Sequence, residues 1–159
     1  MHTRFKLADV VRITGWSEHQ IDYWRRLGLA VPVEGGDSRG SHCEYSALGV
    51  IEIALAGELM EVAGLSATKV AHVFALHRRA LAKVPRKYRA VELWKRYVAS
   101  VKAIADTLGQ SNDPKHRRWL VDVARVSERL RRHASRTEQE SCLFAFVERQ
   151  RTGAAAVER

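Results

Sequence analysis

Two short helices joined by a tight turn are the feature that most constrains the fold of this 159-residue chain. Apolar residues recur at helical spacing from Leu7 to Thr14, and Gly15 follows where a left-handed cap would end a helix. Ser17 opens the sequence Ser-Glu-His-Gln, a capping box that starts a second helix, which extends to Gly28. This arrangement is typical of a helix-turn-helix.

The next segments predict a wing and two further helices. Residues 31–45 contain three glycines and one proline between short apolar ends, which predicts a β-hairpin with a flexible tip. Ser46 can cap a third helix that ends at Gly64, and Ser66 a fourth that ends before Pro85.

A heptad pattern follows Pro85. Its apolar residues are spaced by alternating steps of three and four, which predicts a helix whose apolar stripe needs a partner helix. We expect a second copy of the chain to cover this stripe, which consists of Val91, Trp94, Val98, Val101, Ala105 and Leu108. Residues 109–114 break the pattern, a further helix follows, and a last short helix around Leu143, Phe144 and Val147 precedes a polar, frayed tail.

These segments divide the chain into three predicted parts. A winged helix-turn-helix DNA-binding domain occupies residues 1–76, and a linker with a coiled-coil-like dimerisation helix occupies 77–109. A helical C-terminal segment over 110–159 serves as an effector or interaction region. The predicted fold class is mainly α: a winged helix-turn-helix with a small β-hairpin wing, followed by a dimerisation helix and additional C-terminal helices.

The charge of the chain favours a nucleic-acid partner but is unevenly distributed. The formal net charge is +9, and basic surfaces gain free energy when they displace counterions from phosphates. Residues 1–76 carry seven Lys and Arg against nine Asp and Glu, whereas the remainder carries 20 against nine. Contacts between the first part and DNA must therefore depend on a few placed side chains, while the second part supplies the broad positive field.

Membrane, catalytic and metal-binding signals are missing from the sequence. No apolar run approaches the roughly 18 residues of a membrane span, and the first residues lack the apolar core of a signal peptide. We therefore expect a cytoplasmic, nucleoid-associated protein in which Cys43 and Cys142 stay reduced. There is no nucleophile elbow, P-loop or Gly-rich dinucleotide turn, so no enzymatic activity and no cofactor are predicted.

Two groups of side chains allow a ligand site but have a simpler explanation. His72 and His77 have the spacing of one histidine pair of a zinc site, but no Cys-x-x-Cys accompanies them, and no metal site is predicted. Aromatic residues of the C-terminal half either line an effector pocket at the dimer or pack in the core, and packing explains them more simply. They are Trp94, Tyr97, Trp119, Phe144 and Phe146.

A set of short motifs stands in a fixed order in the first half of the chain. It comprises LADVVRITGWSEHQIDYWRRLGLAVP, then EYS, then AGLSATKVAHVF, from Leu7 to about Phe74. Together these motifs resemble the MerR-type (mercury-resistance-like) winged helix-turn-helix transcription regulators. The resemblance implies a long antiparallel dimer helix, a variable C-terminal effector segment, and promoter DNA that is bent and untwisted on activation. The family commonly has phosphate-holding arginines at two positions where this chain has Asp22 and Cys43.

The outer face of the second helix is the candidate DNA-contacting surface. At about 100° per residue, Ile21 and Trp24 fall on its inner side. On the outer side, Arg26 can reach guanine or phosphate, and Asp22 can accept from a cytosine amino group or orient Arg26. Arg39 at the wing tip can replace the missing wing arginine. The full candidate set is Arg12, Ser17, His19, Asp22, Tyr23, Arg26, Arg39 and Tyr45. Of these, Tyr45 is expected mainly to pack at the base of the wing, with its hydroxyl free to meet a phosphate.

We therefore interpret the chain as a dimeric transcription regulator that binds a pseudo-palindromic promoter element and deforms it. The expected partners are double-stranded DNA, a second copy of the chain and RNA polymerase, and the sequence does not identify an effector. Two alternatives remain open. One is an architectural or excision-type accessory DNA-binding protein with the same fold. The other is a protein-interaction module in which Asp22 and Cys43 mark lost DNA contacts.

Overall fold

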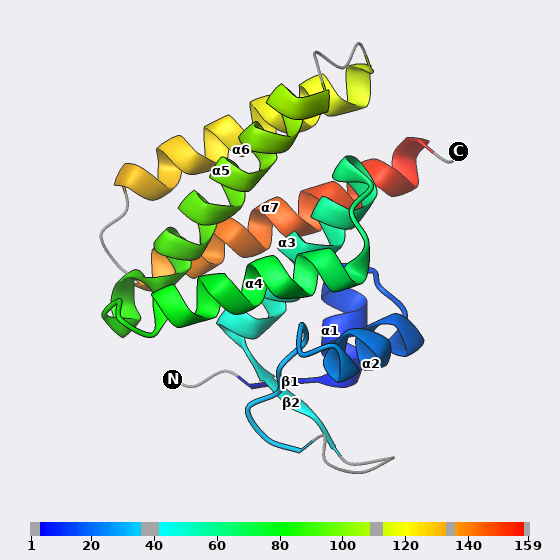
Figure 1. Cartoon of the computed structure of the whole chain (residues 1–159), viewed down its shortest axis with the longest axis vertical. Helices are drawn as coiled ribbons and strands as arrows, with labels where there is room; N and C mark the ends of the chain where they lie inside the picture. Colours follow the sequence, from blue (N-terminus) through cyan, green and yellow to red (C-terminus); the bar gives the residue numbers. More distant parts are fainter. Residues whose placement is uncertain (1–3, 36–41, 109–112, 133–135, 158–159) are drawn as a thin grey trace.

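The computed structural model describes residues 4–35, 42–108, 113–132 and 136–157 (Figure 1). These ranges form helices and one small antiparallel sheet, as predicted. In chain order the elements are β1 (Arg4–Lys6), α1 (Leu7–Thr14), α2 (Glu18–Arg26), β2 (Glu44–Ser46), α3 (Ala47–Ala63), α4 (Ala67–Leu81), η1 (Arg86–Tyr88), α5 (Arg89–Leu108), α6 (Pro114–Arg132) and α7 (Arg136–Val157). No helix within them is long and apolar enough to cross a membrane.

Serine caps begin the three helices for which the sequence predicts them. The Oγ atoms of Ser17, Ser46 and Ser66 each accept a hydrogen bond from a backbone N–H at the start of α2, α3 and α4. Gly15 and Gly64 end α1 and α3 with φ angles of 76° and 63°, a conformation in which a side chain would be strained. The predicted starts of α2, α3 and α4 and the predicted ends of α1 and α3 are confirmed, because the signals that set them are local. α2 and α4 end somewhat earlier than predicted, at Arg26 and Leu81.

The small sheet differs from the predicted hairpin in its partner strand. β2 pairs antiparallel with β1, and Phe5 lies opposite Tyr45 in the register. The segment that precedes the wing tip joins β2 at a bridge between Glu34 and Glu44. The hairpin prediction over 31–45 is therefore only partly correct. β1 alternates polar, apolar and polar side chains, but three residues are too few for this pattern to indicate a strand, and its strand conformation depends on pairing with a distant segment.

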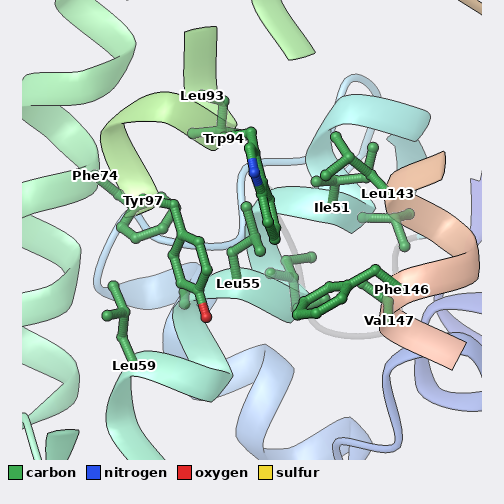
Figure 2. Packing of buried hydrophobic residues seen from close by; sticks show 14 of the residues in the cluster. Ile51, Leu55, Leu59, Phe74, Leu93, Trp94, Tyr97, Leu143, Phe146 and Val147 are labelled. Carbon is green, nitrogen blue, oxygen red and sulfur yellow. The ribbon is translucent and has the colours of Figure 1, made fainter. Parts of the chain in front are cut away.

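Helix α3 is the centre of the hydrophobic core. It contacts α1, α4, α5 and α7, and every residue from Val50 to Gly57 is buried. A helix that is apolar on all sides is stable only when other elements surround it. Figure 2 shows how core side chains from α3, α4, α5 and α7 gather around it.

The apolar stripe of α5 packs largely on the same chain. Trp94 and Val101 are only 1% and 4% exposed. The Trp94 ring meets the Phe146 ring of α7 at 5.0 Å, and its Nε1 donates to the Ser127 hydroxyl of α6 at 2.6 Å. A second copy of the chain is therefore not needed to cover these two positions. The alternating positions Val91, Val98 and Ala105 are partly exposed, and the side chain of Leu108 lies outside the described residues.

The last helix is longer than the sequence suggests. α7 extends from Arg136 to Val157, whereas the sequence analysis predicts one short helix and a frayed tail. Its buried residues Cys142, Leu143, Phe146 and Val147 belong to the common core, and α7 contacts α1, α3, α5 and α6. Tertiary packing of this apolar face stabilises a helix that its own sequence pattern marks only weakly.

Aromatic residues of the C-terminal half pack against each other and around one carboxyl group. Trp94 lies against Tyr97, and Tyr97 against Trp119, with ring centroids 5.3 and 6.0 Å apart. Tyr97 Oη and Trp119 Nε1 both donate to Oε2 of Glu58, at 2.7 and 3.0 Å. The Glu58 residue is partly exposed, but its carboxyl group is buried. Burial raises the pKa of this carboxyl to about 7, because hydrogen bonds from two neutral donors replace the lost hydration only in part. These contacts support packing as the role of the aromatic side chains.

Candidate nucleic-acid interface

The turn before α2 fixes where this helix begins. The Ser17 hydroxyl accepts a hydrogen bond from the backbone N–H of Gln20 at 3.2 Å. In return, the Ser17 backbone N–H donates to Oε1 of Gln20 at 3.1 Å. The capping box predicted from the sequence is complete, and the exposed Ser17 therefore positions α2.

The inner face of α2 is anchored to the core by two tryptophans. Ile21 and Trp24 are buried, and the Trp24 ring meets the Trp16 ring edge-on at 5.1 Å. Trp16 lies against Gly57 of α3, where a single Cβ atom would overlap its indole ring. The orientation of α2 thus depends on close packing between the turn and α3.

The outer face of α2 presents three polar side chains to solvent. His19, Tyr23 and Arg26 are all exposed, with exposed fractions of 47% for Tyr23 and 62% for the Arg26 side chain. Steps of four and three residues keep them on one side of the helix. An imidazole, a phenol and a guanidinium group on one exposed face can bond to base edges and phosphates.

Asp22 joins both arginines of α2. One carboxylate oxygen accepts from Arg26 at 2.5 Å and the other from Arg25 at 2.7 Å. The hydrogen bond from Arg26, and to a smaller extent the one from Arg25, lower the pKa of Asp22 to about 2. Asp22 therefore sets the direction of the Arg26 guanidinium, one of the two roles considered for it. With Glu18, it also leaves α2 without net charge.

A second ion pair, which sequence reasoning missed, holds the C-terminal end of α2. The Arg78 guanidinium of α4 donates to Oε1 of Glu52 in α3, to the carbonyl of Gly28 and, at 2.6 Å, to the carbonyl of Leu29. Burial raises the pKa of Glu52, although Arg78 opposes this effect. The signal was present in the sequence as one glutamate inside the apolar run VIEIALA. A carboxylate there requires a buried cationic partner.

The remaining candidates differ in exposure. Arg12 is exposed in the last turn of α1. Tyr45 is only 1% exposed, and burial raises its pKa to about 12. Tyr45 is therefore a packing residue of the core, as expected, but its burial corrects the expectation that its hydroxyl is free to meet a phosphate. Arg39 lies outside the described residues. Arg4, not predicted, pairs across the sheet base with two glutamates, at 2.6 and 3.0 Å.

The cysteines and histidines considered above are dispersed. Cys43 and Cys142 are free thiols. His72 is exposed, whereas His77 is buried beside Phe74, with ring centroids 5.3 Å apart. Within the described ranges, no three His, Cys, Asp or Glu side chains are grouped so that they could hold a metal ion.

Comparison with known families agrees with this geometry. Residues 5–76 match the family described as MerR HTH family regulatory protein, a span that covers the helix-turn-helix, the sheet, α3 and most of α4. Searches of the curated proteins and of the solved structures find no match. Residues 5–76, 72 of the 159 residues, therefore form a helix-turn-helix domain of the MerR type.

Proposed function

We propose that this chain regulates transcription by inserting α2 into the major groove of a promoter element. The exposed row of His19, Tyr23 and Arg26 carries the proposal, because the major groove admits an α-helix and displays a distinct pattern at each base pair. Arg26 contacts guanine or phosphate, and the other two contact base edges or phosphates. Arg12 and the wing residue Arg39 supply further phosphate contacts.

The proposal includes binding as a pair of copies to a pseudo-palindromic element. A two-fold pair presents one α2 and one wing to each half-site. The partly exposed edge of α5, formed by Val91, Val98 and Ala105, is the surface through which we propose that the copies meet. Deformation of the promoter between the half-sites adds a sequence-dependent cost. RNA polymerase at the promoter, in the cytoplasmic nucleoid, is the proposed downstream partner.

Two observations favour a second candidate function, a protein-interaction module. Asp22 neutralises part of the positive charge of α2, and residues 1–76 carry more acidic than basic side chains. Both features weaken the attraction of this domain to phosphate. An architectural or excision-type DNA-binding protein, the other alternative, would use the same face of α2 but coat DNA cooperatively.

Selection of genomic DNA fragments by the purified chain, followed by footprinting, tests the proposal. A regulator protects one element with two symmetry-related halves upstream of a gene, and the Arg26→Ala variant loses this enrichment. Extended cooperative protection would favour the architectural alternative. If no fragment is retained even at low salt, the DNA-binding proposal fails and the protein-interaction module replaces it.

A further inference from the structure

Helix α6 is the most positively charged of the described helices. It carries seven lysines and arginines against Asp122 and Glu128, and all seven basic side chains are exposed. Six of the seven are arginines. The planar guanidinium of arginine matches the geometry of phosphate better than the ammonium of lysine does.

Four of these arginines form one stripe, which we call the α6 arginine stripe. Arg118, Arg125, Arg129 and Arg132 follow one another at steps of seven, four and three residues. At about 100° per residue they stay within about 60° of each other around the helix axis, and the stripe is about 21 Å long. Within the described part of the chain, Arg132 pairs with Glu128 at 3.2 Å, and the other three have no ion pair.

The α6 arginine stripe is not explained by packing. The opposite face of α6 buries Trp119, Val123, Val126 and Leu130 in the core. The helix therefore needs no lipid surface and no partner helix to cover its apolar side. Unpaired like charges along one face repel each other, which disfavours the stripe unless a polyanion neutralises it.

The stripe lies far from the MerR-type domain's DNA-contacting face. In Figure 1, α6 is at one end of the long axis of the molecule, and α2, β1 and β2 are at the other. A duplex that lies across the α2 end of the molecule is therefore remote from α6. The partner of the stripe is therefore a different molecule or a distant segment of the same one.

We propose that the α6 arginine stripe is a second binding surface for duplex DNA, which contacts phosphates without reading bases. This surface lets one chain hold two duplex segments, one at α2 and one at α6. The holding of two segments rests on the proposed function of α2 as a DNA-binding helix, whereas the phosphate contacts of α6 do not. Strong binding to duplex phosphate is expected where positive charge is concentrated, and in this chain the charge is concentrated in the C-terminal half.

A bridging assay tests this proposal. One duplex of about 20 base pairs is fixed to beads, and a second, labelled duplex of the same length is free in solution. Duplexes of this length are too stiff to bend from α2 to α6, because the persistence length of DNA is about 150 base pairs. The test variant carries Arg118→Gln, Arg125→Gln and Arg129→Gln. The matched control carries Arg79→Gln, Lys83→Gln and Arg86→Gln, which remove the same charge from exposed positions outside α6. Thermal unfolding confirms that both variants are folded.

The wild type and the control should capture the labelled duplex, and the α6 variant should capture about tenfold less at low salt. The α6 variant should also lower the log–log salt slope of binding to random DNA by roughly 2.7, about 0.9 for each lost phosphate contact. A salt slope that is the same in the α6 variant and the wild type, or an equal decrease in the control, would overturn the proposal. Lack of capture by the wild type, together with a lower slope in the α6 variant, would instead refute DNA binding at α2. Arg26→Ala separates the two surfaces: it should leave the α6 contribution to the salt slope unchanged whether or not α2 reads a promoter.

Discussion

Replacement of Gly57 by alanine should destabilise this protein, although alanine is the better helix former. Gly57 is buried inside α3, where the change would gain about 0.5–1 kcal/mol of helix propensity. The added Cβ, however, would overlap the Trp16 indole and come within 2.5 Å of its Cζ2 atom. Overpacking of this kind costs about 1–3 kcal/mol. The predicted net loss is therefore up to about 2.5 kcal/mol, or up to roughly 10 °C in the thermal midpoint.

The cause of this loss can be checked with matched variants. Gly49→Ala in the same helix is the control, because its Cβ would meet no atom closer than the Ser46 hydroxyl, at 3.3 Å, and would touch Val31 and Tyr45 at ordinary contact distances. It should change the unfolding free energy much less. In the Trp16→Leu background, Gly57→Ala should cause much less loss of unfolding free energy. A double-mutant cycle by urea unfolding measures this coupling between the two positions. If Gly57→Ala stabilises the protein, or if the two changes are additive, the account of how Trp16 anchors α2 is refuted.

Three further predictions concern the core, the end of α2 and the pairing of copies. The pKa of Glu58 is about 7 in the folded protein, above its ordinary value of 4.5. Between these two pH values the folded protein therefore binds one more proton than the unfolded chain, and the free energy of unfolding falls as the pH rises. Glu58→Gln should remove this loss and gain up to about 3 kcal/mol on the wild type between about pH 5 and pH 8 in urea unfolding; parallel pH profiles would contradict it. Arg78→Met should cost about 2–3 kcal/mol because Glu52 loses its partner, and adding Glu52→Leu should recover part of this loss; no recovery would argue against the pair as the cause. Val98→Glu, at a partly exposed site, should leave the fold intact and give monomers in light scattering; a wild type already monomeric at micromolar concentration would exclude pairing through α5.

Local signals explain which parts of the fold could be predicted from the sequence. Ser17, Ser46 and Ser66 begin helices because each side chain caps a backbone N–H a few residues ahead, whatever the rest of the chain does. β1 could not be found in this way, because three residues acquire strand conformation only by pairing with β2. Local patterns thus determine where helices start, and distant contacts determine which strands form.

The stripe on α5 shows a different limit. The heptad spacing correctly marks Trp94 and Val101 as buried, but a periodic apolar pattern does not reveal which helix covers it. Here side chains of α6 and α7 of the same chain pack on the stripe, as at Trp94. The position of α7 in the core could not be predicted, because the apolar periodicity of its sequence is weak.

The candidate interface was predictable on α2 and less so around it. Alternation between buried and exposed positions assigned His19, Tyr23 and Arg26 to the outer face, where the structure has them. The ion pairs of Asp22 with Arg25 and Arg26 follow from spacings of three and four residues. The packing role of Tyr45 was predictable, but the burial of its hydroxyl was not, because distant elements close over a residue between the wing and α3.

The most direct test of the central claim is a comparison of DNA binding by the wild type and the Arg26→Ala variant. Fluorescence anisotropy measures both on the fragment that the wild type selects and on a scrambled duplex, with Arg131→Ala on α6 as the control for loss of one exposed arginine. If α2 reads bases, Arg26→Ala weakens binding to the selected fragment about 5- to 150-fold, as expected for a bidentate base contact, and changes binding to the scrambled duplex much less. The control should retain the preference for the selected fragment. Equal affinity of the wild type for the two duplexes at every salt concentration, or no effect of Arg26→Ala on either, would contradict the claim that α2 recognises DNA.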